Sequence, residues 1–314
     1  MLVRSIAGVM AVLLTAAMPA HSSGFSNIQL QSQVEALFAG NRDMAEIKLT
    51  VDRLTNPSVN EPEGLKEIAR LEADLDRMAA GETDSLAKLA TLKRFVYEAG
   101  PWNQGRPFQY DLTDPTGQKP ENRLLTDYLA DRHGNCVSMP LLFMVLGQHI
   151  GLKMTLAQAP LHVFVKFTDD QGREWNLETT SGAGFTRDMH YRKLLPMSDA
   201  AVASGIYLHA LSREEVIGVM ATELVSHFLD EGRFEDAIVA SDVILKHAPK
   251  LAYVLVKRGS AYGGILRCDI VTKYKSMSEM TPETKAYADG LYQANLADFA
   301  AAEALGWREQ DGQL

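Results

Sequence analysis

The sequence predicts an α+β protein in which helices pack on a short antiparallel sheet and an all-α region follows. Three observations carry this prediction. Apolar residues recur at helical spacing through residues 26–100, and helical patterns return from about Ser212. Between these regions, the segments 162–167 and 174–178 contain the aromatic and branched residues that strands favour. The polar turn 169–172 joins them, which indicates an antiparallel hairpin.

These changes of pattern divide the chain into four parts. We expect a targeting segment at 1–22, an N-terminal helical region at 23–84, the mixed core at 85–210 and a C-terminal helical region at 211–314. A chain of 314 residues, 46% of them hydrophobic, can bury one large core or two moderate ones. The formal net charge of −9 and the lack of a basic run argue against a nucleic-acid partner.

The first 22 residues are typical of a secretory signal peptide. Arg4 supplies the positive start, an apolar stretch follows at 6–17, and small residues surround Ala20 and Ser22. A retained membrane anchor is the alternative, but the apolar stretch is shorter than the roughly 20 residues of a span. We therefore expect cleavage after Ala20 or Ser22 and a periplasmic or secreted protein. No later segment is long and apolar enough to cross a bilayer, so the mature protein is expected to be soluble.

The N-terminal region reads as packing helices without chemistry. Apolar residues such as Leu30, Val34 and Leu37 share one helical face, and residues 56–62 break the pattern. Residues 101–122 are rich in Gly, Pro, Asp and Asn and are predicted to be irregular. A short helix at 124–129, a turn at 131–136 and an apolar helix at 137–149 should follow.

Cys136 lies where that turn runs into the apolar helix. A thiol at a helix N-terminus faces unpaired N–H groups and the positive end of the helix dipole, both of which favour the thiolate. Pro140 limits where the helix begins, so either it starts near Ser138 or its first turn is loosened around the sulfur. This makes Cys136 a candidate nucleophile.

A nucleophilic cysteine needs a base within hydrogen-bond reach. His149 lies thirteen residues along the same helix, about 20 Å away at 1.5 Å per residue. His133 belongs to the same turn as Cys136 and is poorly placed to point across at the sulfur. His162 begins a predicted strand that can pack against the helix, and it is therefore the better candidate for the base.

The base in turn needs an orienting partner. Because side chains alternate along a strand, His162 and Glu178 share a face when the two strands pair with an even sum of residue numbers. A sum of 340 places them directly opposite, and a sum of 342 makes them diagonal neighbours. Asn176 shares that face and competes for the orienting role, while Trp175 and Leu177 should point into the core. An odd sum would break the arrangement.

A repeat pattern occurs in the C-terminal region. Six residues match the offsets of the 34-residue tetratricopeptide pattern: Phe228, Gly232, Phe234, Ala237, Ile244 and Pro249. A second unit starts at Gly259 and Tyr262, is interrupted at 267–283, and is followed by a closing helix at 292–305. Since solenoids normally need three or more units, we expect these helices to lean on the core.

The segments around the candidate residues resemble the transglutaminase-like superfamily. The resemblance rests on Arg132-His133-Gly134-Asn135-Cys136-Val137-Ser138-Met139-Pro140, Ala159-Pro160-Leu161-His162 and Asn176-Leu177-Glu178-Thr179-Thr180-Ser181-Gly182. It is closest to the bacterial branch whose core precedes tetratricopeptide repeats, and it covers about 85–305. It implies a papain-like core with Cys136 as nucleophile and His162 as base. The superfamily usually has aspartate in the third place, where this chain has Glu178.

The remaining candidate residues suggest no further chemistry. Cys268 falls in a helix of the repeat region and reads as core filling, although a Cys136–Cys268 disulfide is an alternative in an oxidising compartment. No His/Cys/Asp/Glu cluster has the spacing of metal ligands, and there is no Gly-rich phosphate loop. No cofactor is expected.

Two functions are compatible with these observations. In the first, Cys136 attacks the amide of a peptide or protein and the thioester is resolved by water or by an amine. In the second, the core is a catalytically inactive scaffold, and the repeat region binds a protein partner. The reactivity of Cys136 distinguishes the two.

Overall fold

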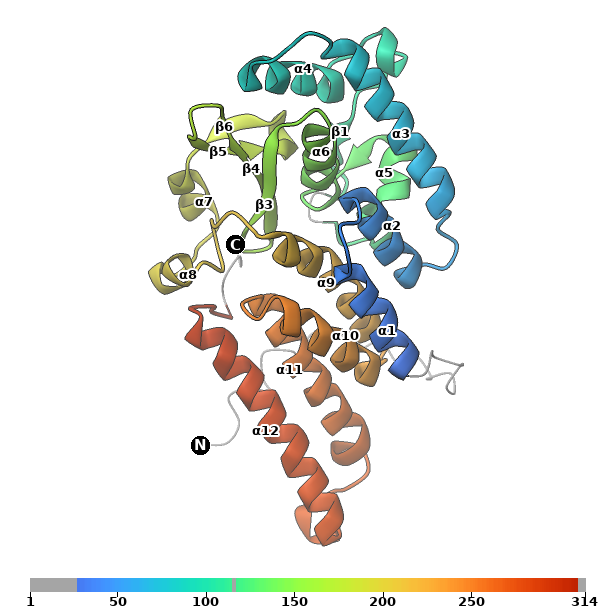
Figure 1. Ribbon diagram of the computed structural model, residues 1–314. Coiled ribbons are helices and arrows are strands. Elements are labelled where there is room, and N and C mark those ends of the chain that lie inside the picture. The colour runs from blue at the N-terminus through green and yellow to red at the C-terminus, as the bar shows by residue number, and fades with distance from the viewer. Residues whose placement is uncertain (1–26, 115–116, 310–314) are drawn as a thin grey trace.

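The computed structural model describes residues 27–114 and 117–309 (Figure 1). The predicted signal peptide lies outside the described residues. Within them, many helices surround one small antiparallel sheet, and a purely helical region follows. The predicted α+β class is therefore confirmed.

The four N-terminal helices do not form a separate layer. Their bounds are α1 (Asn27–Phe38), α2 (Met44–Thr55), α3 (Glu61–Met78) and α4 (Ser85–Tyr97). Helix α4 lies over the sheet end of the molecule, while α1 packs far from it, beside the C-terminal helices (Figure 1). Glu35 of α1 accepts hydrogen bonds from Lys246 at 2.6 Å and His247 at 2.8 Å, and the His247 ring stacks on Phe38. The N-terminal helices thus join the core to the C-terminal region.

The sheet has the order β3-β4-β5-β6, and all of its neighbours are antiparallel. Its elements are β3 (Lys153–Ala159), β4 (His162–Thr168), β5 (Glu174–Glu178), the 3-10 turn η3 (Thr179–Ser181) and β6 (Gly184–Thr186). The predicted hairpin is β4–β5. The sequence did not predict β3 and β6, because one follows a helix almost directly and the other is only three residues long.

The register of β4 and β5 decides which side chains can meet. Val165 lies opposite Leu177, so the paired residue numbers sum to 342, one of the two even sums considered. His162 and Glu178 are therefore diagonal neighbours on one face. Leu177 is fully buried as expected, whereas Trp175 is only half-buried and donates its Nε1–H to Asp169 at 3.0 Å.

The segment before Cys136 is less irregular than predicted. It contains η1 (Pro101–Asn103), β1 (Gln109–Tyr110), η2 (Pro120–Arg123), α5 (Leu125–Asp131) and β2 (His133–Gly134), and then leads into α6 (Ser138–His149). Strand β1 pairs in parallel with β2, so this excursion returns to the turn that carries Cys136. Helix α6 packs on β3 and β4 and begins at Ser138, the first of the two alternatives that Pro140 allowed.

Two short helices and an extended segment link the sheet to the C-terminal region. The helices are α7 (Asp188–Leu194) and α8 (Asp199–Ser204). Leu208 then donates its N–H to the Gln158 carbonyl at 2.8 Å, and Leu211 donates to the Leu156 carbonyl at 2.9 Å. This segment covers the free edge of β3, which limits the pairing of that edge with another chain.

The C-terminal helices pack in antiparallel succession below the core (Figure 1). Their bounds are α9 (Arg213–Asp230), α10 (Phe234–His247), α11 (Ala252–Leu266), the π-helical η4 (Arg267–Val271), η5 (Met277–Glu279) and α12 (Pro282–Ala304). Ala237 is fully buried. Gly232 lies in the turn between α9 and α10 with φ +70°, in the left-handed region that favours glycine.

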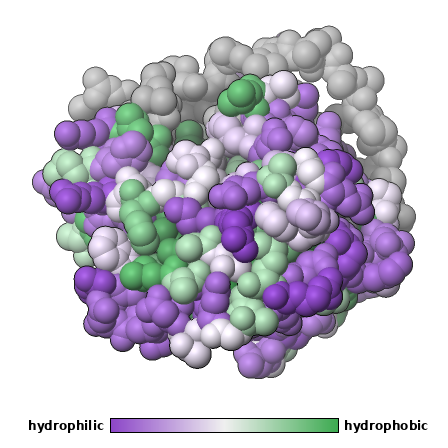
Figure 2. All heavy atoms as spheres, turned by 90° about the horizontal axis from the view of Figure 1, so that it is seen from above, coloured by the Kyte–Doolittle hydropathy of each residue, from purple (hydrophilic) through white to green (hydrophobic). Residues whose placement is uncertain are grey.

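The far end of α12 returns to the core. Ser198 donates its hydroxyl hydrogen bond to the Gly306 carbonyl at 2.7 Å, and Ser204 donates to the Leu305 carbonyl at 2.6 Å. Within the described part of the chain, no helix combines the length and the apolarity that a membrane span requires. Seen from the α4 end, hydrophobic patches are interspersed among hydrophilic side chains (Figure 2).

Candidate functional site

Asn135 fixes the turn that carries Cys136. The Asn135 side-chain oxygen accepts the N–H groups of Val137 at 2.9 Å and Ser138 at 3.2 Å. The Ser138 hydroxyl in return accepts the N–H of Asn135 at 3.2 Å. This reciprocal arrangement caps the first turn of α6. Cys136, only 6% exposed, is therefore held at the N-terminus of an apolar helix.

The backbone just before Cys136 has no room for a larger residue. A Cβ added to Gly134 would lie 2.5 Å from a ring carbon of Tyr128 and 2.7 Å from the Met139 side chain. The Gly134 carbonyl accepts the N–H of Asp111 at 2.7 Å, which attaches the turn to the excursion that contains β1. The glycine in this segment is thus required by close packing rather than by its own φ.

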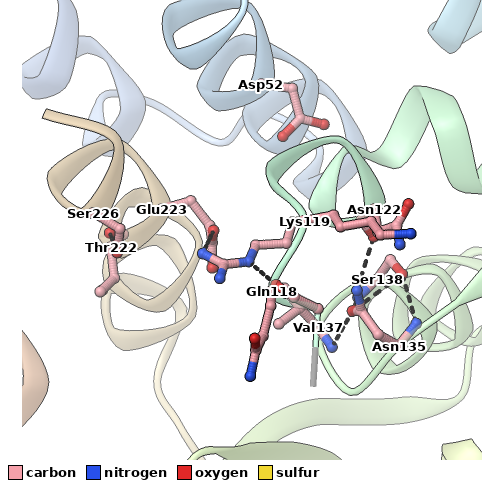
Figure 3. A network of polar contacts seen from close by, with 12 residues as sticks. Asp52, Gln118, Lys119, Asn122, Asn135, Val137, Ser138, Thr222, Glu223 and Ser226 are labelled. Atoms are coloured by element: carbon pink, nitrogen blue, oxygen red, sulfur yellow. Dashed lines mark hydrogen bonds and ion pairs between the residues drawn. The ribbon is translucent and has the colours of Figure 1, made fainter. Parts of the chain in front are cut away.

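A polar network ties the Cys136 turn to both flanking helical regions, and Figure 3 shows the part of it that involves Asn122 and Glu223. The Asn135 side-chain amide donates to the Asn122 carbonyl at 2.8 Å. The next carbonyl, that of Arg123, accepts from the Lys48 ammonium of α2 at 2.9 Å. The Arg123 guanidinium in turn pairs with Glu223 of α9 at 3.2 Å. The neighbouring carbonyls of Asn122 and Arg123 therefore receive contacts from the Cys136 turn and from α2. The Arg123 side chain extends the network to α9.

Lys48 and Asp52 form an ion pair that is almost fully buried. The second carboxylate oxygen of Asp52 accepts the N–H of Leu125 at 2.8 Å, so Asp52 satisfies the start of α5 from a different helix. The sequence pattern assigned these helices no polar role, because a charged pair four residues apart normally lies on a solvent-exposed face.

His162 lies at the start of β4, close to the N-terminus of α6. The Cys136 sulfur is 3.8 Å from the carbonyl oxygen of Leu161, the residue before His162. The His162 Nε2 lies 2.8 Å from a carboxylate oxygen of Glu178, and the Cys136 thiol is near enough to affect the charge of the His162 ring. Both members of the His162–Glu178 pair are largely shielded from solvent, with side-chain exposures of 16% and 13%.

Glu178 is held by donors on all sides. Besides His162, the carboxylate accepts from the Tyr191 hydroxyl at 3.0 Å, from the Thr180 N–H at 3.0 Å and from the Thr180 hydroxyl at 2.6 Å. The Tyr191 ring stacks on Phe164, the next residue on the same face of β4. The carboxylate is thereby fixed in position and fully satisfied.

These contacts set the charges of the pair. Burial opposes a charged imidazole, but the interactions with Cys136 and Glu178 outweigh it and raise the pKa of His162 from 6.5 to about 9. Burial likewise opposes a carboxylate, yet the hydrogen bond and charge of His162, with the bonds from Thr180, lower the pKa of Glu178 to about 2. Near neutral pH the site therefore holds an imidazolium between a sulfur and a carboxylate.

Asn176 does not reach His162. It lies opposite Lys166, further along the hairpin, and its side-chain amide donates to Asp188 at 2.7 Å. Asp188 is the first residue of α7, the helix that carries Tyr191. Of the two side chains considered for the orienting position, the structure places Glu178 beside His162.

The transglutaminase-like superfamily matches residues 63–222, half of the chain. The chain belongs to the transglutaminase-like superfamily. This membership implies a papain-like fold for the matched part, which contains Cys136, His162 and Glu178.

A curated relative adds little about function. The transglutaminase-like chain is 27% identical over 152 residues to the UPF0162 protein of Buchnera aphidicola subsp. Baizongia pistaciae (strain Bp). The match covers 47% of this chain and 55% of that protein, so it spans about half the length of the relative. No solved structure matches the chain.

The two histidines considered as alternatives and the second cysteine make their contacts away from Glu178. His133 is exposed and bonds to the Asp131 carbonyl, while His149 pairs with Glu72 and Asp76 at the far end of α6. Both cysteines are free, and Cys268 is half-buried in η4 rather than filling a core. Among the described residues, no three His, Cys, Asp or Glu side chains are grouped so that they could hold a metal ion.

Three side chains around the pair were missed by sequence reasoning. Thr180 belongs to the segment that carries the family resemblance, but its spacing gave it no role. Tyr191 lies on a short helix that no pattern predicted. Tyr110 of β1 also lies near: burial first, and then the charges of Cys136 and Glu178, raise the pKa of Tyr110. Only knowledge of the tertiary fold could have assigned these residues.

Proposed function

We propose that the protein is a cysteine-dependent acyl-transfer enzyme that acts on an amide of a peptide or protein. The observation that supports this proposal best is the geometry at the start of β4: the Leu161 carbonyl lies 3.8 Å from the Cys136 sulfur, and Nε2 of the next residue, His162, lies 2.8 Å from Glu178. Nucleophile, base and orienting carboxylate in this order are the arrangement that nucleophilic catalysis requires. Glu178 acts here as a positioning residue.

In the proposed reaction, the Cys136 thiolate attacks the carbonyl carbon of the amide. The carbon–nitrogen bond breaks, and the His162 imidazolium gives its proton to the leaving ammonia or amine. Water or a second amine then attacks the thioester, with His162 accepting the proton, and the thiolate is released. The N–H of Cys136 is suited to donate to the oxyanion, since Asn135 already takes up the N–H groups of Val137 and Ser138.

Alkylation of the purified mature protein tests this proposal. At pH 6 a free thiol with a pKa of about 8.5 is almost wholly protonated, so Cys136 should react with iodoacetamide about 100-fold faster than such a thiol. His162→Ala should abolish most of this advantage, because the imidazolium stabilises the thiolate. Mass spectrometry of the labelled peptides gives both rates, and Cys268 is the internal control. If Cys136 ignores His162 and reacts like a free thiol, the inactive scaffold becomes the better description.

We also propose that α9 and α10 form a tetratricopeptide-like unit that contributes to binding a protein or peptide. Ala237 is fully buried, as the small residue of that pattern should be. Ala237→Leu should overpack this contact and cost about 1–3 kcal/mol of unfolding free energy. Ala200→Leu, on the exposed side of α8, is the control. An unchanged melting temperature for Ala237→Leu would exclude the repeat assignment. Export through residues 1–22 remains part of the proposal.

A further inference from the structure

The turn before His162 has an unusual backbone. Strand β3 ends at Ala159 and β4 begins at His162, directly opposite, so Pro160 and Leu161 form a two-residue hairpin loop. Leu161 has φ +53°, in the left-handed region that glycine and asparagine tolerate and bulky residues rarely adopt. Its side chain is 61% exposed, so packing of that side chain does not hold the conformation.

A contact from the C-terminal region holds the turn. The Leu161 N–H donates to the Tyr253 hydroxyl oxygen at 2.9 Å, and Tyr253 lies in the first turn of α11. The carbonyl of the same Leu161 faces the Cys136 sulfur at 3.8 Å. One residue thus connects a helix of the C-terminal region to the candidate nucleophile, and the next residue along the chain is His162.

We propose that Tyr253 is a positioning residue of the Cys136–His162 site. By accepting the Leu161 N–H, Tyr253 keeps the turn left-handed, which sets the Leu161 carbonyl against the sulfur and fixes the direction in which β4 starts at His162. Helix α11 is then a working part of the site, although it lies beyond the residues that match the family. This inference rests on the proposed function.

Tyr253→Phe tests the inference because it removes only the hydroxyl. The loss of one hydrogen bond should slow alkylation of Cys136 at pH 6 about three- to tenfold. At pH 9, where an ordinary thiol with a pKa of about 8.5 is already largely ionised, the effect should be smaller. Tyr262→Phe, on the same helix, is the matched control and should leave both rates unchanged. A change in folding alone would alter the alkylation rates at pH 6 and pH 9 by the same factor and would lower the melting temperature.

Substitutions of Leu161 test the same idea from the other side. Leu161→Val should reproduce the Tyr253→Phe defect, because a β-branched residue strongly disfavours φ near +53°. Leu161→Asn should restore much of the lost rate in the Tyr253→Phe background, since asparagine tolerates the left-handed region.

Two results overturn the inference in distinguishable ways. Equal pH 6 rates for wild type, Tyr253→Phe and Leu161→Val would exclude the positioning role while leaving the proposed function intact. A wild-type Cys136 that is unreactive at pH 6 would exclude both.

Discussion

The two halves of the candidate site are held by different forces. The Cys136 turn is fixed by uncharged hydrogen bonds, those of Asn135 with Val137 and Ser138 being local, and those of Asn135 with Asn122 and of Asp111 with Gly134 being longer in range. The His162–Glu178 half is fixed by charge, and its contacts span 16 residues to Glu178. The position of the Cys136 thiol thus depends largely on the local turn at the start of α6. The position of His162 depends on the register and packing of the sheet.

This difference has an energetic consequence. Neutral caps contribute to stability at every pH, whereas a paired imidazolium and carboxylate contribute only while both are charged. The two halves should therefore respond differently to pH and to substitution. Three predictions follow this contrast, from the largest expected effect to the smallest.

The pH dependence of stability should isolate the charged half. Because the folded-state pKa of His162 is raised from 6.5 to about 9, its stabilisation is present in full below pH 6.5 and is lost as pH rises through 9. The loss should be on the order of 3 kcal/mol. The folded-state pKa of Glu178 is lowered from 4.5 to about 2, so its stabilisation is present above pH 4.5 and is lost as pH falls through 2. Urea unfolding of wild type and His162→Gln from pH 6 to 10 measures the difference.

The matched control for that series is His133→Gln, which changes an exposed histidine near the same turn. Its unfolding free energy should follow the wild type at every pH. If the difference between wild type and His162→Gln stays constant from pH 6 to 10, the imidazolium does not stabilise the fold.

The same contrast explains how much the sequence could predict. The position of Cys136 at the start of an apolar helix followed from the local pattern, whereas Pro140 left two alternatives for the residue at which α6 begins. The observed sum of 342 was one of two even sums considered, beside an odd sum that would have broken the arrangement. No local pattern could choose among these registers. Tyr191 and Tyr253 approach the site from α7 and α11, so their roles depend on chain packing that spacing does not encode.

The uncharged half should be broken by Asn135→Ala. The substitution removes the cap of α6 and leaves the N–H groups of Val137 and of the fully buried Ser138 without their acceptor. We expect a loss of about 2–3 kcal/mol of unfolding free energy, the same at pH 6 and pH 9. Asn60→Ala is the control, because Asn60 caps α3 at an exposed position and should cost about 1 kcal/mol or less. Equal costs for the two variants would mean that burial adds nothing to the Asn135 cap.

The smallest effect should come from Tyr191→Phe, which removes one of the donors to the Glu178 carboxylate and keeps the ring stacked on Phe164. Burial and the Glu178 charge raise the pKa of Tyr191, so the hydroxyl is protonated and donates throughout the working pH range. Since Thr180 and His162 still satisfy the carboxylate, the variant should lose about 1 kcal/mol of unfolding free energy and slow Cys136 alkylation at pH 6 about two- to fivefold. The matched control is Tyr287→Phe, which removes a tyrosine–carboxylate bond of 3.1 Å to Asp269 at an exposed position and should change neither quantity. A Tyr191→Phe variant that matches Tyr287→Phe in both measurements would show that Thr180 and His162 hold Glu178 without the Tyr191 hydroxyl. A rate loss of more than 100-fold would instead place the Tyr191 hydroxyl in contact with the reacting atoms.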